Sequence, residues 1–155
     1  MNKKVFEDEE YRANDSRGRN AVRSHLDRSG RFSLFPTDVY GPDILSIRMY
    51  DSCVVDIFRH EVEVKRGWKD DWPGSWRTIQ VPARREYLTN SPYPVILWVL
   101  RDDLQKAWCI TGDQLQERFL GEVPNKKVPS GEMFYKIPIE NCKIVEIGDN
   151  GSDFS

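Results

Sequence analysis

The segment Val54-Val55-Asp56-Ile57-Phe58-Arg59-His60-Glu61-Val62-Glu63-Val64-Lys65 combines strand-forming residues with charges that gather at its end. Side chains alternate between the two faces of a strand, so the last two valines are expected to face a core. The two glutamates, Glu61 and Glu63, and Lys65 then line the opposite face. Carboxylate oxygens of this kind suit Mg²⁺, and a neighbouring ammonium can act on a water beside a phosphate. The segment therefore predicts a strand with a chemically active polar face.

Two simpler interpretations compete with a chemical role for this region. A solvent-facing strand with cross-strand charge pairs accounts for the glutamates and the lysine. The upstream Gly41-Pro42-Asp43 is an ordinary turn sequence. Other acids nearby, which are Asp38, Asp51 and Asp56, are interpreted first as surface residues.

The preceding residues predict the other strand of a hairpin, from Asp43 to about Met49. A tight turn at Asp51-Ser52 would place the first residue of this strand opposite His60. The alternation of side chains slips near Ile57-Phe58, which predicts a bulge or bend there. A shift of about three residues is needed if Asp43 is to meet Glu63 across the hairpin.

Further elements follow from apolar spacing and from glycine and proline positions. A helix from about Arg17 to Ser29 has Ser16 or Asp15 as its cap and Gly30 as its stop. The remaining expected elements are a helix from Pro82 through Leu88, strands at 95–100 and 107–111 that form a hairpin, a short helix at 114–120, and strand-like residues from 135 to 147.

Length and composition indicate one globular domain. The chain has 155 residues, 39% of them hydrophobic and 31% charged, and we place the domain at residues 1–147 with a flexible tail at 148–155. No apolar run reaches the ~18 residues of a membrane span. The first ten residues turn acidic where a secretory signal would be apolar, so we expect a cytoplasmic protein with no membrane partner. Three scattered cysteines and two histidines argue against a zinc site or a disulfide framework.

Basic and aromatic residues cluster despite a net charge of -2. Arginines recur between Tyr11 and Arg31, and Arg84-Arg85 form a further cluster; each is either a solvated face or a contact for phosphates. Three tryptophans recur at every fourth residue after the charged strand, in a loop that Pro73-Gly74 keeps from being a regular helix. They either pack the loop onto the core or offer stacking surfaces to unpaired bases. These tryptophans are Trp68, Trp72 and Trp76.

The order of these elements predicts an α/β fold with a mixed sheet. Within it, Pro42-Asp43, then Glu63-Val64-Lys65, then the helix that begins Val81-Pro82-Ala83-Arg84-Arg85, and then the strand from Val95 to Leu100 resemble the PD-(D/E)XK nuclease superfamily. That superfamily includes restriction endonucleases and many phage and recombination nucleases. The resemblance spans about residues 17–120 and implies a three-layer restriction-endonuclease-like sandwich, in which helices flank a central mixed β-sheet.

The resemblance also implies a metal site. It makes Asp43 and Glu63 ligands of Mg²⁺ or Mn²⁺, adds the Val64 carbonyl as a third ligand, and gives Lys65 the task of positioning or activating the attacking water. Phosphodiester hydrolysis requires hydroxide near neutral pH and neutralisation of charge in the transition state, and a bound divalent cation supplies both.

Two further positions are matched through the family. The first helix often carries a glutamate at the metal site, and here that position holds Asn20. Its carbonyl can orient a water or ligate the metal; otherwise Glu10 serves from upstream, or the chain is a non-catalytic relative. Arg84, ahead of Gln80 and Arg85, matches the position that presents a polar side chain to phosphate.

The function implied by this resemblance is that of a metal-dependent DNA endonuclease, with branched or structured DNA as its substrate. A homodimer is a further expectation, because two strands need two active sites. The alternative is a non-enzymatic module that retains the fold and binds nucleic acid or a protein partner through its basic helix and tryptophan loop.

Overall fold

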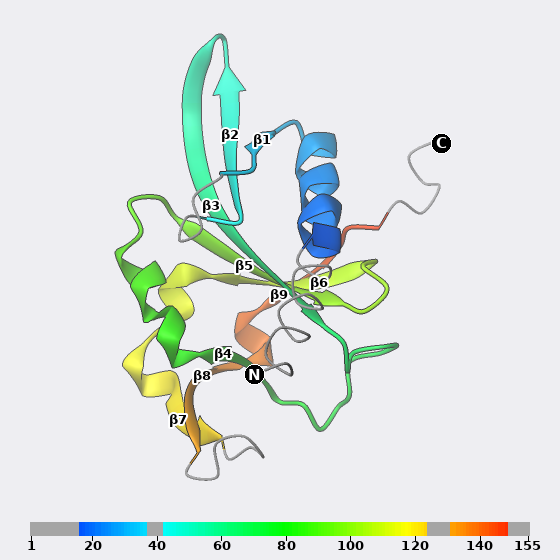
Figure 1. The fold of residues 1–155 in the computed structure, drawn as a ribbon, viewed down its shortest axis with the longest axis vertical. Helices are drawn as coiled ribbons and strands as arrows, with labels where there is room; N and C mark the ends of the chain where they lie inside the picture. Colours follow the sequence, from blue (N-terminus) through cyan, green and yellow to red (C-terminus); the bar gives the residue numbers. More distant parts are fainter. Residues whose placement is uncertain (1–15, 37–41, 124–130, 149–155) are drawn as a thin grey trace, which may run out of the picture.

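The computed structural model describes residues 16–36, 42–123 and 131–148. Two β-sheets organise these residues (Figure 1). The expectations for Glu10, Asp15, Asp38 and nearly all of the C-terminal tail lie outside the described ranges. The helices in the described part of the chain all fall short of the length and apolar character needed to cross a membrane.

The larger sheet has six strands in the order β1-β2-β3-β5-β6-β9. β3 and β5 are parallel, whereas each of the other neighbouring pairs is antiparallel. The expected α/β fold with a mixed sheet is therefore confirmed. The strands are Phe32–Leu34 (β1), Ile44–Tyr50 (β2), Cys53–Lys65 (β3), Val95–Arg101 (β5), Lys106–Thr111 (β6) and Lys143–Glu146 (β9).

A helix at residues 16–28 covers one face of this sheet. Its apolar residues Val22 and Leu26 are buried in a core that includes Val62 of β3. The helix approaches β3 closely at Gly18, where an added Cβ would lie 3.0 Å from both Val62 and Val64. Gly30 ends the helix with a φ of 83°, a conformation that glycine adopts without strain. The expected helix and its stop are thus confirmed.

The opposite face is covered by a second sheet rather than by long helices. This antiparallel sheet has the order β4-β8-β7, with strands at Thr78–Pro82, Glu132–Pro138 and Leu120–Val123. Ile79 and Ile137 of this sheet lie in one core with Leu88 of the 3₁₀ helix η1 (Ala83–Asn90). The large sheet contributes buried side chains from β5 and β6 to the same core, namely Val95, Leu97, Val99 and Ile110.

Several local predictions were wrong in type or extent. The helix expected from Pro82 is the 3₁₀ helix η1, and the one expected at 114–120 is two 3₁₀ turns, Gly112–Gln114 (η2) and Glu117–Phe119 (η3). The strand-like residues 135–147 divide between two sheets, because a 3₁₀ turn at Ile139–Asn141 (η4) directs the chain from β8 to β9. Strand β4 was not expected, since a charged loop precedes it and its five residues give little periodicity.

Candidate active site

The hairpin of β2 and β3 determines which acids meet. Its turn is tight, with Asp51 and Ser52 at φ values of 51° and 64°. The register shifts between Arg48 and Met49, so that Val55 of β3 is the extra residue. The bulge expected near Ile57-Phe58 is therefore in the wrong place, and the shift is one residue rather than three.

This register brings Asp43 to Glu61 instead of Glu63. Ile44 pairs with His60, which puts the preceding Asp43 across from Glu61 on the same face of the sheet. One Asp43 carboxylate oxygen, Oδ2, accepts a hydrogen bond from the Val62 backbone N–H at 2.9 Å. The Asp43 carboxylate lies close enough to Glu61 for its charge to act on that side chain. Asp43 and Glu61 are called the acid pair below.

Burial and charge act together on Glu61, which is only 5% exposed. Burial and then the Asp43 carboxylate raise the pKa of Glu61 to about 7. Arg59 acts in the opposite direction, because its Nε donates to Glu61 Oε1 at 2.7 Å. The first two effects outweigh the ion pair. The acid pair is consequently a place where two carboxylates share limited space and one of them readily holds a proton.

Glu63 and Lys65 follow Glu61 at intervals of two residues on the same face of β3. Both line a cavity of about 280 Å³ between β3 and the loop that leads into β4. Lys65 Nζ lies 5.2 Å from the centre of the Trp76 ring, and Arg77 and Gln80 also line the cavity. The acid pair, Glu63 and Lys65 thus form one polar strip that ends in a cationic, aromatic cavity.

Arg85, not Arg84, is the helical arginine that faces this strip. Arg85 lines a small hollow with Glu61 and Glu63. Arg84 has a side chain that is 73% exposed and contacts Glu132 of β8 at 3.3 Å. The structure therefore turns the expected phosphate-binding residue Arg84 away and presents Arg85 in its place. Successive residues of a tight 3₁₀ helix point in different directions, which a position match in sequence does not resolve.

Asn20 lies on the other side of the sheet from the acid pair. It is exposed on the helix at residues 16–28, which packs against the Val62 and Val64 face of β3. In this position the Asn20 side chain cannot reach the metal site that the family match assigns to it, because the sheet lies between them. The Val64 side chain also faces this helix. Its backbone carbonyl, however, points toward β2, because residues two apart in a strand direct their backbone groups to the same side and the Val62 N–H already points to Asp43 there.

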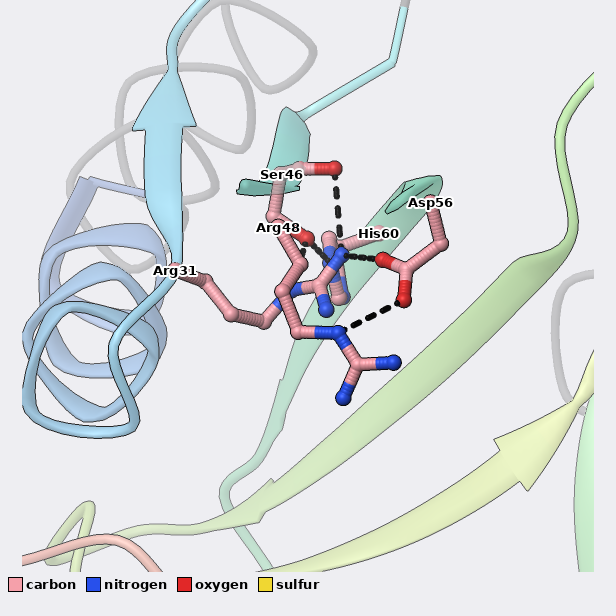
Figure 2. A network of polar contacts seen from close by, with 5 residues as sticks. All are labelled: Arg31, Ser46, Arg48, Asp56 and His60. Atoms are coloured by element: carbon pink, nitrogen blue, oxygen red, sulfur yellow. Dashed lines mark hydrogen bonds and ion pairs between the residues drawn. The ribbon is translucent and has the colours of Figure 1, made fainter. Parts of the chain in front are cut away.

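A buried Ser46–His60 pair resembles a nucleophile and its base, but its hydrogen bonds exclude that role (Figure 2). The Trp98 indole N–H, which can only donate, bonds to His60 Nδ1 at 2.9 Å. Neutral His60 therefore carries its proton on Nε2 and donates it to Ser46 Oγ, 2.6 Å away. Such a histidine cannot accept the serine proton, and both residues are at most 1% exposed.

The rest of this network is structural as well. Arg31 donates to Ser46 Oγ at 2.8 Å and pairs with Asp56, which also contacts Arg48 (Figure 2). The network joins the segment after the helix to both strands of the hairpin. His60, which is 1% exposed, faces the core between β3 and the helix.

The tryptophans of the loop after β3 pack against one another and against β6. Trp68 is 1% exposed and stacks on Trp108, and Trp72 makes edge contacts with Trp68, Trp76 and Trp108. Core packing therefore accounts for Trp68. Trp72 and Trp76 are partly exposed and both line the 280 Å³ cavity, so these two rings combine packing with a surface for a ligand.

In residues 16–36, 42–123 and 131–148, no three His, Cys, Asp or Glu side chains converge to hold a metal ion on their own. The acid pair offers two carboxylates, and Mg²⁺ commonly takes one or two carboxylates together with waters and substrate phosphates. No protein-family model and no curated protein matches this sequence.

Sequence reasoning left Glu61 out of the site and ranked Arg85 behind Arg84. The signal for Glu61 was present, since a tight turn at Asp51-Ser52 sets Asp43 opposite His60 and a one-residue bulge moves it to Glu61. A bulge of defined size could not be located from alternation alone. No comparable signal in the sequence distinguishes Arg85 from Arg84.

Proposed function

We propose that this chain is a metal-dependent DNA endonuclease that hydrolyses phosphodiester bonds. The observation that carries the proposal is the placement of Asp43 across from Glu61, at the head of a polar strip that continues through Glu63 to Lys65. A buried carboxylate such as Glu61 is seldom placed beside a second acid without a functional reason, and an acid with a perturbed pKa marks a candidate site. The strip opens into a cavity with cationic walls, which suits a phosphate-bearing substrate.

The acid pair fits a divalent cation. Its oxygens are hard donors, and their mutual repulsion would be relieved by a cation. Asp43 and Glu61 would hold Mg²⁺ or Mn²⁺, with the Val64 carbonyl and Glu63 as additional donors along the same strip. A bound divalent cation polarises a phosphoryl oxygen and lowers the pKa of water.

The surrounding residues suit phosphate binding. Lys65 can donate to a non-bridging phosphate oxygen or to the attacking water from its place in the cavity. Arg85 faces Glu61 and Glu63, so its guanidinium can neutralise charge on the phosphate beside them. Gln80 lines the same cavity and offers an amide for orientation.

The proposal includes the finer features that the family resemblance implies. These are a restriction-endonuclease-like fold in which the second sheet and η1 take the place of one helical layer, a cytoplasmic location, structured DNA as substrate, and a homodimeric state. The position of Asn20 favours a second candidate, a non-catalytic nucleic-acid-binding module, because the helix residue matched to the metal site is exposed on the opposite side of the sheet.

A cleavage assay separates the two functions. Purified protein would be incubated with supercoiled, linear and branched DNA in Mg²⁺, Mn²⁺ or EDTA, beside Glu63→Gln and Lys65→Met. An endonuclease cleaves DNA in Mg²⁺ or Mn²⁺ and is inactive in EDTA. Lys65→Met should lower its rate by at least about 100-fold, because one positioned acid–base group contributes that much or more to a rate. Binding of DNA without cleavage by the unaltered chain would instead establish the non-catalytic module.

The two adjacent arginines give a matched pair of variants. Arg85→Ala should lower kcat/KM by about 10- to 100-fold, because it removes a charge that faces the acids. Arg84→Ala should leave the rate within about two-fold, since its contact is an exposed ion pair of little energetic value. Initial cleavage rates at several DNA concentrations test both. The opposite order of effects would return the phosphate-binding role to Arg84.

A further inference from the structure

An uncovered apolar face lies on the part of the large sheet formed by β1, β2 and β3. Directly paired residues share a face of a sheet. Phe32 pairs with Ile47, and Leu34 pairs with Leu45. The same face continues along the hairpin through further cross-strand pairs. The members of this set, called the arm face, are Phe32, Leu34, Leu45, Ile47, Met49, Val54 and Ile57.

The arm face is exposed to an extent that is unusual for a set of large apolar side chains. Phe32 and Leu34 are 64% and 56% exposed, and Val54 and Met49 are 55% and 39% exposed. The hairpin projects beyond the rest of the sheet (Figure 1). Contiguous apolar patches of more than a few hundred Å² on a protein surface mark interaction sites.

The polarity of the hairpin is inverted relative to an ordinary half-exposed sheet. Its polar side chains, among them Ser46 and Asp56, lie on the side of the helix, where Arg31 and His60 hold them in the network of Figure 2. Its apolar arm face points the other way, where four of its seven side chains are exposed to solvent and the other three are half-buried. An antiparallel sheet normally buries its apolar face and solvates its polar one. The arm face therefore requires a cover that a single chain does not supply in the described residues.

We propose that this cover is a second copy of the chain, packed through the same face about a two-fold axis. A two-fold interface places each patch against its own copy, and an uncharged patch meets itself without like-charge repulsion. Arg59, which pairs with Leu45 at the end of this face, is already held by Glu61 at 2.7 Å. The proposal concerns the interface alone and does not depend on nuclease activity at the polar strip.

The available area fits such a dimer. The exposed fractions of the arm-face side chains amount to roughly 500 Å² per protomer, and a standard interface buries about 800 Å² per protomer, of which about 60% is apolar. The arm face therefore supplies about the apolar part of one. The face also runs along β2 to Asp43, so a partner would lie beside the acid pair.

The oligomeric state at rising protein concentration tests the proposal. Light scattering coupled to size-exclusion chromatography should give twice the 18.1 kDa chain mass at micromolar concentration. Phe32→Glu and Val54→Glu should each shift the protein to the monomer, or raise the dissociation constant by at least about 10-fold. Ile144→Glu is the matched control, since Ile144 is 45% exposed on β9 at the other edge of the sheet, and it should leave the dimer intact.

A label at Cys53 provides a second measurement that does not depend on a variant's stability. Cys53 is exposed near the hairpin turn, whereas Cys109 and Cys142 are half-buried. A nitroxide at Cys53 should give an intermolecular dipolar distance that disappears on dilution with unlabelled chain. A wild-type chain that stays monomeric well above micromolar concentration, or a dimer that withstands both glutamate variants, overturns the proposal. A monomer that binds lipid vesicles through Phe32 would assign the face to a membrane instead, and would overturn it too.

Discussion

Glu61→Gln should abolish metal-dependent cleavage and leave the protein folded, if the acid pair is the catalytic centre. Glutamine keeps the size and hydrogen-bonding capacity of a protonated carboxyl, but it cannot contribute a negative charge to a cation. Loss of a ligand worth several kcal/mol in the transition state predicts a fall in rate of at least about 1,000-fold. Initial rates of DNA cleavage in Mg²⁺ measure this effect, and Asp43→Asn should match it.

Stability measurements separate this loss from unfolding. The pKa of Glu61 is raised to about 7, so the folded chain holds its proton more tightly than the unfolded chain does. That contribution to stability is fully present below pH 4.5 and is lost as the pH rises through 7. Glu61→Gln should therefore melt at or above the wild-type temperature at about pH 8 in EDTA. Full cleavage activity in this variant would remove Glu61 from the site and leave Glu63 as the acid to test.

His60 should make the free energy of unfolding depend strongly on pH in the opposite direction. Burial, followed by the nearby Arg31 charge, lowers the pKa of His60 to about 4. Between pH 4 and 6.5 the unfolded chain binds more protons at this residue than the folded chain does. Its contribution to stability is therefore present above pH 6.5 and is lost as the pH falls toward 4, by about 3 kcal/mol in total.

Urea unfolding in EDTA from about pH 8 to about pH 4 would reveal this contribution once Glu61 is replaced. In the wild type, Glu61 gains stability and His60 loses it as the pH falls from 7 to 4.5, so the two dependences partly cancel. Glu61→Gln should show the full His60 slope, with a smaller contribution of the same sign from His25, whose pKa is also lowered by burial. Adding His60→Gln should remove most of the slope, because glutamine can pair with Ser46 and Trp98 without titrating.

An unchanged slope in that double variant would mean that His60 does not hold the low pKa. The free energy of unfolding of the double variant at neutral pH is the control for a loss of packing. Glutamine should retain much of the buried network at neutral pH, where His60 is neutral in any case. A collapse of stability at every pH would show instead that the imidazole shape, and not its charge state, is what the core requires.

Local features of the fold were predictable because they depend on neighbouring residues. The helix at 16–28 follows from Val22 and Leu26 at helical spacing and from Gly30 as a stop. The β5–β6 hairpin follows from an apolar run, Val95 to Leu100, that requires cover on both faces. The alternation that sets Val62 apart from its charged neighbours is a property of any strand, and it holds in β3.

The second sheet was not predictable in the same way. Strand β4 is short, and its partners β8 and β7 come from residues far along the chain. Their pairing is decided by which surfaces remain to be buried after the large sheet has formed. Ile79 and Ile137 are therefore core residues for a tertiary reason, and the short 3₁₀ turns between strands reflect that packing rather than helix propensity.

By itself, the sequence determined that Asp43, the glutamates of β3 and Lys65 would lie on or beside a hairpin, with the charges of β3 on one face. Only the tertiary structure decided which of these acids meet. A single extra residue, Val55, moves Asp43 from His60 to Glu61, and the packing of η1 turns Arg85 rather than Arg84 toward them. Periodicity fixes the face of a side chain because it is local, whereas register and helix rotation depend on contacts between distant segments.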